Sequence, residues 1–320
     1  MKIALLGTGF GQAHAAVYAA RDDVEVVVFG RTPAALDRIH DSHGFSTTTD
    51  LDGLYDDPTV DLIDICLPTA LHAEHALRAL AAGKHVLCEL PLALTMSDAE
   101  QVAAAAEAGD RQVFVDMFDR FGPANRLLFD AVHAGTYGRL VALELDMHTA
   151  LRWPGYDLRL DSIALDVMHG DLDIVTQLLG VPESVSTAGV SGGQRGSAAH
   201  AVLTYPAATA RVSASALMPD AYGSRGGCRA TFTDGVLEHY FGEVGEDGED
   251  ATVVEYTAAG RRVLTAQGSG SYTAMIEHVL ACLRGEADNR IALSSVLDAL
   301  ALTLDIHHAI QSEPRSGPVS

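Results

Sequence analysis

The chain has 320 residues, 48% hydrophobic and 20% charged, which is typical of an ordinary globular protein. Its 21 Lys and Arg against 43 Asp and Glu give a formal charge of −22. Because nucleic acids and anionic membrane surfaces are bound through clustered Lys and Arg, this balance argues against both as partners. The length favours two domains over a single core.

The four cysteines lie far apart and form no Cys-x-x-Cys pair. We therefore expect buried, reduced thiols and no metal site. Glycines interrupt the apolar run at the N-terminus, "MKIALLGTGFG", too early for a secretory signal, and no run approaches membrane-spanning length. We expect a cytoplasmic protein.

The first part of the chain alternates strand-like and helical segments. The segments typical of buried strands are "KIALLG", "VEVVVFG", "VDLIDICLP", "KHVLCEL" and "QVFVDMF". Those typical of helices are "QAHAAVYAA", "TPAALDRIHDSHG", "EHALRALAAG" and "SDAEQVAAAAEAG". Pro33 suits a first helical turn, and Gly44 suits a helix end. The alternation predicts a parallel sheet covered by helices on both faces.

From about Phe121 onward the pattern changes. Helices are predicted near 123–135 and 166–180, with a strand at 139–149 between them. The segments typical of further strands are "SVSTAGV", "HAVLTYP", "ARVSASAL", "CRATFT", "GVLEHYF", "TVVEYT" and "RRVLTA". Because turn residues separate these closely spaced segments, they predict an antiparallel sheet. Two helices, near 272–283 and 294–310, close the chain.

The stretch "GTGFGQAHAAVY" follows the first strand and opens the first helix. Gly7 permits a tight turn, and Gly9 lets the backbone approach a pyrophosphate at the helix N-terminus. The third glycine of the G-x-G-x-x-G fingerprint would fall at Gln12, whereas Gly11 comes one place early. His14 either touches the cofactor or faces solvent. The position of the stretch predicts a dinucleotide site. The expected contacts are Gly7, Thr8, Gly9, Phe10, Gly11 and Gln12.

The end of the second strand distinguishes between cofactors. An NAD-binding unit usually carries Asp or Glu there for the ribose 2′-hydroxyl. Here the chain reads Phe29-Gly30-Arg31-Thr32, without a carboxylate. Arg31 can pair with a 2′-phosphate, and the Thr32 hydroxyl can add a hydrogen bond. We therefore predict NADP rather than NAD.

With these segments together, the chain resembles the glucose-fructose oxidoreductase/inositol dehydrogenase (Gfo/Idh/MocA) family. The resemblance is densest in "DICLPTALHAEHALRALAAGKHVLCELPLALT", which is similar to the family's P-x-x-x-H loop, A-G-K-H-V strand and E-K-P turn. It covers the first domain well and the rest more loosely.

This resemblance implies an α/β protein, with a Rossmann dinucleotide-binding domain over residues 1–120. An α/β substrate-binding domain with an open, mainly antiparallel sheet would follow over 121–320. Such a sheet often forms the oligomer interface, so we expect a homodimer or homotetramer. The resemblance also implies further cofactor contacts, although His72 has the alternative of a purely structural role. These contacts are Leu67, Pro68, Thr69, His72, Glu89 and Leu90.

Two catalytic motifs of the family are altered here. Leu90 stands where the lysine of E-K-P meets the reacting oxygen, and leucine cannot donate a proton. The family's D-x-G-x-H-x-x-D motif is similar to "DVMHGDLD", in which Asp166 and Asp173 match but Gly170 takes the histidine place. His169 lies one residue earlier, and helical spacing puts it on the same side as Asp166 and Asp173. We predict His169 and Asp166 as catalytic and Asp173 as a carboxylate partner and substrate ligand. The alternative is a packing role for His169.

Two more residues are candidates for substrate binding. Arg120 lies in a turn similar to the family's R-F-x-P, where anchoring of the domain junction is the alternative. Trp153 is the only tryptophan and lies in a loop that leads to the second motif.

Three functions are compatible with these residues. The first is an NADP(H)-dependent oxidoreductase that reduces a small imine, conjugated C=C or keto-sugar substrate with a non-standard proton donor. The second is a redox-neutral, cofactor-assisted isomerase, eliminase or hydrolase. The third is a non-catalytic, ligand-sensing protein. We favour the first, because the fold can hold a nicotinamide against an acceptor carbon without a lysine.

Overall fold

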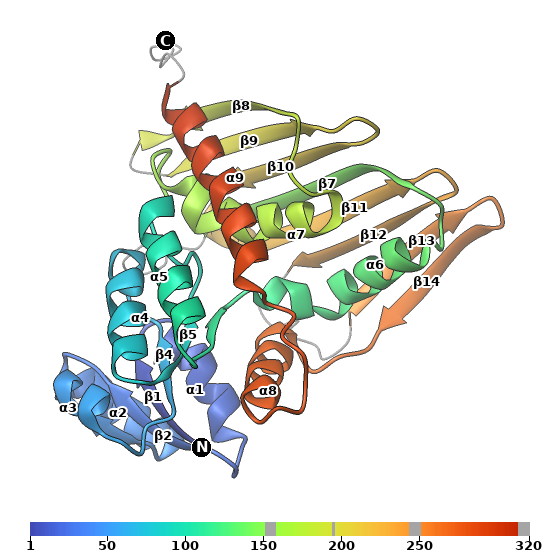
Figure 1. Ribbon diagram of the computed structural model, residues 1–320. Helices are drawn as coiled ribbons and strands as arrows, with labels where there is room; N and C mark the ends of the chain where they lie inside the picture. Colours follow the sequence, from blue (N-terminus) through green and yellow to red (C-terminus); the bar gives the residue numbers. More distant parts are fainter. Residues whose placement is uncertain (151–157, 194–195, 243–250, 313–320) are drawn as a thin grey trace. The chain divides into compact units, whose positions relative to one another are not determined.

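The computed structural model describes residues 1–150, 158–193, 196–242 and 251–312, which form two compact units (Figure 1). The first unit comprises Met1–Phe118 and Tyr272–Leu297. The second comprises Asp119–Ser271 and the described residues from Asp298 onward. This division differs from the predicted one in that residues 272–297 return to the first unit.

A six-stranded parallel sheet forms the centre of the first unit. Its strands are β1 (Lys2–Leu6), β2 (Glu25–Phe29), β3 (Ser46–Thr48), β4 (Leu62–Ile65), β5 (His85–Cys88) and β6 (Val113–Val115). Their order is β3-β2-β1-β4-β5-β6, and every neighbouring pair is parallel. The order reverses between β1 and β4, and Rossmann folds bind dinucleotides outside the carboxyl ends of the strands at such a switch point. The predicted parallel sheet is confirmed.

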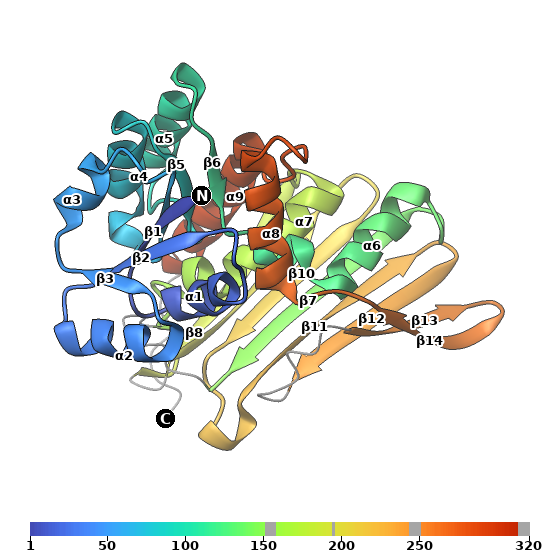
Figure 2. The same ribbon diagram turned by 90° about the horizontal axis from the view of Figure 1, so that it is seen from below.

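Helices cover both faces of this sheet. They are α1 (Gly11–Ala19), α2 (Pro33–His43), α3 (Leu51–Asp56), α4 (His72–Ala81) and α5 (Met96–Ala108). Figure 2 shows α1 and α2 on one face and α4 and α5 on the other. Pro33 begins α2, and Gly44 ends it with a left-handed φ of 74°. Both features were predicted, whereas the short β3 and α3 were not.

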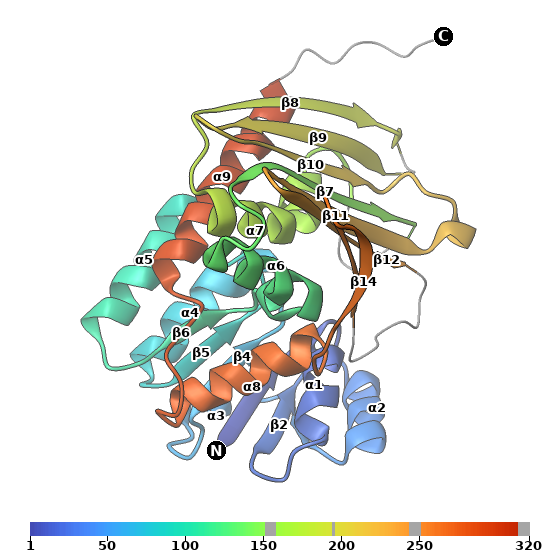
Figure 3. The ribbon, with the colours of Figure 1, turned by 90° about the vertical axis from the view of Figure 1, so that its right-hand side faces the viewer.

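Helix α8 (Ser271–Leu283) completes the first unit although it comes late in the chain. It lies beside α1 (Figure 3). An ion pair joins Arg21 to Glu277 at 3.8 Å, and a second joins Arg284 to Asp23 at 3.2 Å. The first unit is therefore built from two separate stretches of sequence.

The second unit contains an open, eight-stranded mixed sheet. Its strands are β7 (Leu140–Thr149), β8 (Ser184–Ser191), β9 (Ser197–Thr204), β10 (Thr209–Ser215), β11 (Ser224–Phe232), β12 (Gly235–Gly242), β13 (Ala251–Thr257) and β14 (Gly260–Ala266). The order is β14-β13-β12-β11-β7-β10-β9-β8. Strands β7 and β10 run parallel, and the other described pairs are antiparallel. The predicted open, mainly antiparallel sheet is confirmed.

The two faces of this sheet differ in chemistry, as alternation along strands requires. Helices α6 (Pro123–Ala134), α7 (His169–Leu179) and the later part of α9 (Leu293–Ser312) lie over one face (Figure 1), where Leu143, Val212 and Ala230 enter the core. On the other face, Glu144 pairs with Arg229 at 2.9 Å and with Arg211 at 3.6 Å.

Helix α9 is long and apolar enough to cross a membrane by length and composition alone, which the sequence analysis did not anticipate. However, 44% of its apolar window is buried. Leu302, Ile306 and Ile310 belong to the hydrophobic core of the second unit. The apolar character of α9 is therefore explained by core packing.

Candidate functional site

The glycine turn between β1 and α1 has the geometry of a dinucleotide cradle. Gly7 adopts a φ of 119°, and a Cβ at this position would collide with the carbonyl oxygen of Cys66. Gly9 is exposed, and a Cβ there would meet nothing within 4 Å. Gly11 packs against Leu5 and Cys66, so it provides the close helix–strand contact usually made by the third fingerprint glycine. These residues fit a pyrophosphate at the N-terminus of α1.

A cavity of about 230 Å³ lies between the glycine turn and α2. It is lined by Thr8, Gln12, Ala35, Arg38, Ile39, Asp41, Ser42 and His43. The Gln12 side chain donates to the Thr8 carbonyl at 3.0 Å and so fixes the turn, while Phe10 caps α1. Arg38 was not predicted; its only sequence signal is that it is a second arginine shortly after Arg31.

Arg31 and Thr32 lie at the end of β2, as predicted, and both are exposed. Thr32 is the N-cap of α2, and its hydroxyl makes no capping hydrogen bond. Within the described parts of the chain, the Arg31 guanidinium makes no hydrogen bond or ion pair. Both side chains are therefore available to a ligand beside the glycine turn.

His72 connects two loops through hydrogen bonds. Its Nε2 lies 2.6 Å from the Leu67 carbonyl oxygen, and its Nδ1 lies 2.8 Å from the Pro91 carbonyl oxygen. The ring is fully buried, and burial lowers its pKa despite these contacts. These hydrogen bonds agree with the structural alternative for His72, and its cofactor contact stays a prediction. Pro68 and Thr69 follow β4 and keep some solvent exposure.

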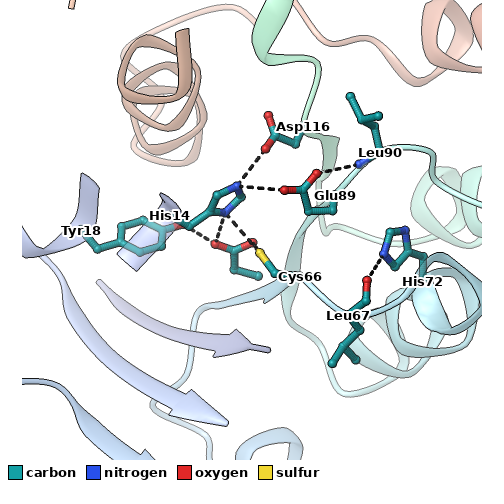
Figure 4. A network of polar contacts seen from close by, with 9 residues as sticks. His14, Tyr18, Cys66, Leu67, His72, Glu89, Leu90 and Asp116 are labelled. Carbon is teal, nitrogen blue, oxygen red and sulfur yellow. Dashed lines mark hydrogen bonds and ion pairs between the residues drawn. The ribbon is translucent and has the colours of Figure 1, made fainter. Parts of the chain in front are cut away.

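Beneath the carboxyl end of the sheet, His14 is the centre of a buried polar cluster (Figure 4). Its Nδ1 lies 2.8 Å from Asp64 Oδ2, and its Nε2 lies 2.8 Å from Asp116 Oδ2. Tyr18 donates its hydroxyl to the same Asp64 oxygen at 2.8 Å, and the Cys66 thiol lies 3.6 Å from the other. His14 has no exposed surface. This burial agrees neither with the predicted solvent exposure nor with the predicted cofactor contact.

The cluster holds a positive charge on His14. Burial opposes that charge, but Asp64 and the other cluster groups outweigh it and hold the His14 pKa well above its ordinary value. Burial and Asp64 raise the pKa values of Tyr18 and Cys66, so both remain neutral donors. An imidazolium therefore donates one N–H to each of two aspartates.

Glu89 is the third carboxyl group beside His14. It follows β5 and is 7% exposed, and its Oε1 lies 3.7 Å from His14 Nε2. Its Oε2 accepts the backbone N–H of Leu90 at 3.2 Å. Among the described residues, Oε1 has no hydrogen-bond partner. Burial and the nearby Asp116 raise the Glu89 pKa to about 8.

A metal ion does not account for this cluster. His14, Cys66 and Glu89 offer potential ligand atoms within 4.8 Å of one another. However, both His14 nitrogens face carboxylate oxygens at hydrogen-bond distance, so neither presents a lone pair to a metal ion. The arrangement is that of a proton-holding network.

In the second unit, Arg120 and Asp173 bind each other. The Arg120 guanidinium donates to both Asp173 oxygens, at 2.7 and 2.6 Å. The two residues are 8% and 1% exposed. Burial raises the Asp173 pKa against the opposing effect of Arg120. Both were predicted to bind substrate, yet here they form a buried bidentate ion pair that braces α7.

His169 is not placed to act as the predicted acid. It is fully buried, and its Nδ1 lies 2.8 Å from the Thr303 hydroxyl, which itself donates to the Ala299 carbonyl. Nδ1 must therefore carry the proton. Burial, with Arg120 nearby, lowers the His169 pKa to about 4. The carboxylate partner proposed for it, Asp173, is occupied by Arg120, so the packing alternative describes His169 better.

The remaining predicted residues have mixed outcomes. Asp166 lies in a π-helical turn, Ala164–Met168, directly before α7 and is half-buried. A Cβ on Gly170 would collide with Asp119 Oδ2. Trp153 lies outside the described residues.

A half-buried acid in α7, Asp171, was not predicted. Burial and the nearby Asp119 and Asp146 raise its pKa well above the ordinary value. No feature of its sequence surroundings distinguishes it from an exposed helical aspartate.

A parallel 3-2-1-4-5-6 sheet with a glycine turn at the switch point defines an NAD(P)-binding Rossmann protein. The family model described as "Oxidoreductase family, NAD-binding Rossmann fold" matches residues 1–117. The first 117 residues are therefore similar to the dinucleotide-binding part of the Gfo/Idh/MocA family.

Characterised relatives match only part of their own length. The chain is 32% identical over 152 residues to 4-carboxy-2-hydroxymuconate-6-semialdehyde dehydrogenase of Sphingobium sp., covering 47% of each protein. It is 31% identical over 153 residues to levoglucosan dehydrogenase of Pseudarthrobacter phenanthrenivorans, covering 44% of this chain and 39% of that protein. It is 30% identical over 128 residues to myo-inositol 2-dehydrogenase of Thermotoga maritima, covering 40% and 38%.

Solved structures share the whole fold at low identity. A 3-ketoreductase from Actinomadura kijaniata, in complex with NADP and TDP-benzene, has a TM-score of 0.82 at 18% identity over 97% of both chains. An oxidoreductase from Agrobacterium radiobacter, in complex with NAD⁺, L-tartaric acid and magnesium, has a TM-score of 0.82 at 17% identity over 98% of this chain and 97% of that one. Both cofactors thus occur on this fold.

Proposed function

We propose that the protein is an NADP(H)-dependent oxidoreductase that reduces a small organic substrate of the imine, conjugated C=C or keto-sugar type. The carrying observation is an open glycine turn beside an exposed Arg31 at the end of β2, where no carboxylate stands. A guanidinium at this place favours a 2′-phosphate through charge-assisted hydrogen bonds.

The names of the relatives support a redox function. They are dehydrogenases of a semialdehyde, of levoglucosan and of myo-inositol. Each match covers less than half of this chain, so the names support a redox function more than a particular substrate. The substrate class rests on Leu90, because an apolar side chain there leaves the lysine mechanism unavailable.

Different residues of the first unit would bind different parts of the cofactor. Gly7 and Gly9 would hold the pyrophosphate, and Arg31 with Thr32 would hold the phosphorylated ribose. A bound nicotinamide supplies the hydride. Leu67 and Leu90 follow β4 and β5, where they would exclude water from the reacting end of the cofactor.

Calorimetric titration with NADPH and NADH tests the cofactor preference. We expect tighter binding of NADPH, and we expect Arg31→Ala to weaken it by about 10- to 100-fold, as for the loss of hydrogen bonds to a charged group. NADH binding should change little, because NADH lacks the 2′-phosphate. Cyclic imines, enones and keto-sugars then form the panel for a nicotinamide absorbance assay.

The matched control is Arg111→Ala. Arg111 is an exposed arginine just before β6, at the opposite end of the sheet, where it contacts His85 at 3.2 Å. It should leave both affinities unchanged. Equal binding of the two nucleotides, or an equal loss of both in Arg31→Ala, would contradict the NADP assignment. Absence of binding to either nucleotide would rule out the redox function.

A further inference from the structure

We propose that Glu89 is the carboxylic acid that donates the proton during this reduction. The inference rests on the proposed function and names the group that takes over the chemistry unavailable to Leu90. Three observations carry it: the charge balance of the cluster, the hydrogen bonding of Glu89 and the position of Glu89 in the sheet.

The first observation is a charge imbalance. Three carboxyl groups, those of Asp64, Asp116 and Glu89, surround one imidazole in a site without solvent. Like charges in such a site cannot all ionise, so one carboxyl keeps its proton. The His14 N–H groups face Asp64 and Asp116 at 2.8 Å, whereas Glu89 Oε1 lies 3.7 Å away. A negative charge on Glu89 would be compensated least by the His14 imidazolium, so Glu89 is the carboxyl group that holds the proton.

The second observation is an unused oxygen. Oε2 of Glu89 accepts the N–H of Leu90, but Oε1 has no hydrogen-bond partner in the described parts of the chain. A buried polar atom without a partner costs about 1–3 kcal/mol. Oε1 is itself buried on the His14 side, so an oxygen without a donor there favours a protonated, uncharged Glu89 over a carboxylate.

The third observation is position. Glu89 directly follows β5, at the carboxyl edge of the sheet where Rossmann folds bind their ligands. Its apolar neighbour Leu90 adds no competing charge. On the other side, the Tyr272 ring meets His14 edge-on at 5.8 Å and stacks on Phe118 at 4.4 Å, which closes the cluster toward α8. Tyr272 therefore covers the cluster on the α8 side, while the Glu89 side chain keeps 9% of its surface exposed.

The proton balance is simple. The acceptor gains two electrons with the hydride, and the O–H bond of Glu89 breaks as a new N–H, O–H or C–H bond forms on the acceptor. The electron pair stays on Glu89, and the resulting carboxylate is stabilised by the His14 imidazolium. Solvent returns the proton after product release. The groups that face Glu89 are His14, Asp64, Cys66, Cys88 and Asp116.

Infrared titration of the cofactor-free protein tests the protonated state directly. We expect a carboxylic acid C=O band at pH 6 that disappears with a midpoint near pH 8 and is missing in Glu89→Gln. Glu74→Gln, an exposed residue of α4, is the matched control and should keep the band. Absence of the band in the wild type would overturn the proposal.

Kinetics test the catalytic role with the best acceptor of the panel above. Glu89→Gln should bind NADPH as the wild type does and lose about 10²- to 10⁴-fold in kcat, together with the fall in kcat near pH 8. If both proteins bind NADPH but kcat is unchanged, the role of Glu89 is wrong. If neither binds NADPH, the proposed function fails first and the catalytic role falls with it.

A second variant covers the case in which Glu89→Gln does not fold. Asp116→Asn removes the carboxylate that, after burial, contributes most to the raised Glu89 pKa. We expect the infrared midpoint and the kinetic midpoint to move together to lower pH. Midpoints that stay in place would overturn the assignment.

Discussion

Leu90 and Glu89 are adjacent residues with linked properties. Leucine brings no positive charge to the end of β5, so the side chain of residue 90 does not lower the pKa of the neighbouring acid, although the Leu90 N–H does. A lysine at this place would both donate a proton and favour the ionised form of Glu89. An apolar residue 90 therefore favours a protonated Glu89, and only the protonated form can donate a proton.

Leu90→Lys tests this linkage. The new ammonium group should lower the Glu89 pKa by more than one pH unit, because an opposite charge at contact distance favours the carboxylate. The infrared midpoint should fall accordingly from about 8. Leu90→Met, with similar volume and no charge, should leave it in place. An unchanged midpoint in the lysine variant would show that residue 90 does not influence the acid.

Some site residues could be predicted from sequence, and others could not. Gly7, Gly9 and Arg31 follow from local chemistry, since turn geometry and phosphate charge depend on neighbouring residues. His14 instead meets Asp64 and Asp116 across 50 and 102 residues. An aspartate inside the apolar segment "DLIDICLP" was a usable signal of a buried charge, although its partner could not be inferred.

At the scale of elements, the start of α7 explains why regular helical spacing did not predict the surroundings of His169. Regular helical spacing was used to place Asp166 and His169 on one side. The π-helical turn Ala164–Met168 breaks that spacing, because it contains more residues per turn. The regular elements themselves were predicted well from hydrophobic period, whereas β3 and α3 were missed because "STTTDLDGLYDD" is short and polar.

The Arg120–Asp173 pair should matter for stability more than for catalysis. Arg120→Met leaves a carboxyl group buried without its partner and should destabilise the protein by about 3–5 kcal/mol. The double variant Arg120→Met/Asp173→Leu should regain most of this loss, since it removes both charges. Urea unfolding followed by circular dichroism measures both. A double variant as unstable as the single one would show that Arg120 has further essential contacts.

For the whole molecule, the His14 cluster links folding to pH. The raised His14 pKa stabilises the fold below about pH 6.5, and this contribution is lost as the pH rises through the higher folded value. Between pH 4.5 and about 8, the folded state keeps a proton on Glu89 that the unfolded state has already released. Stability should therefore fall with rising pH for both groups.

Glu89→Gln isolates the second contribution. One proton changes the free energy of unfolding by up to about 1.4 kcal/mol per pH unit. At pH 5 the variant and the wild type should unfold at similar temperatures. At pH 8.5 the variant should unfold at a higher temperature than the wild type. Calorimetry across this range, with Glu74→Gln as the control, measures the difference. Parallel curves for wild type and variant would contradict the raised Glu89 pKa.

The divided first unit has a consequence for biosynthesis. The ribosome completes all six of its strands by Val115, but α8, which covers His14 through Tyr272, emerges only after most of the second unit. At roughly 5–20 residues per second, the nascent sheet waits on the order of ten seconds for this helix. During that interval the charged cluster faces water. A fragment that stops at Phe118 would remain in this immature condition, so the nucleotide-binding unit cannot be isolated by simple truncation.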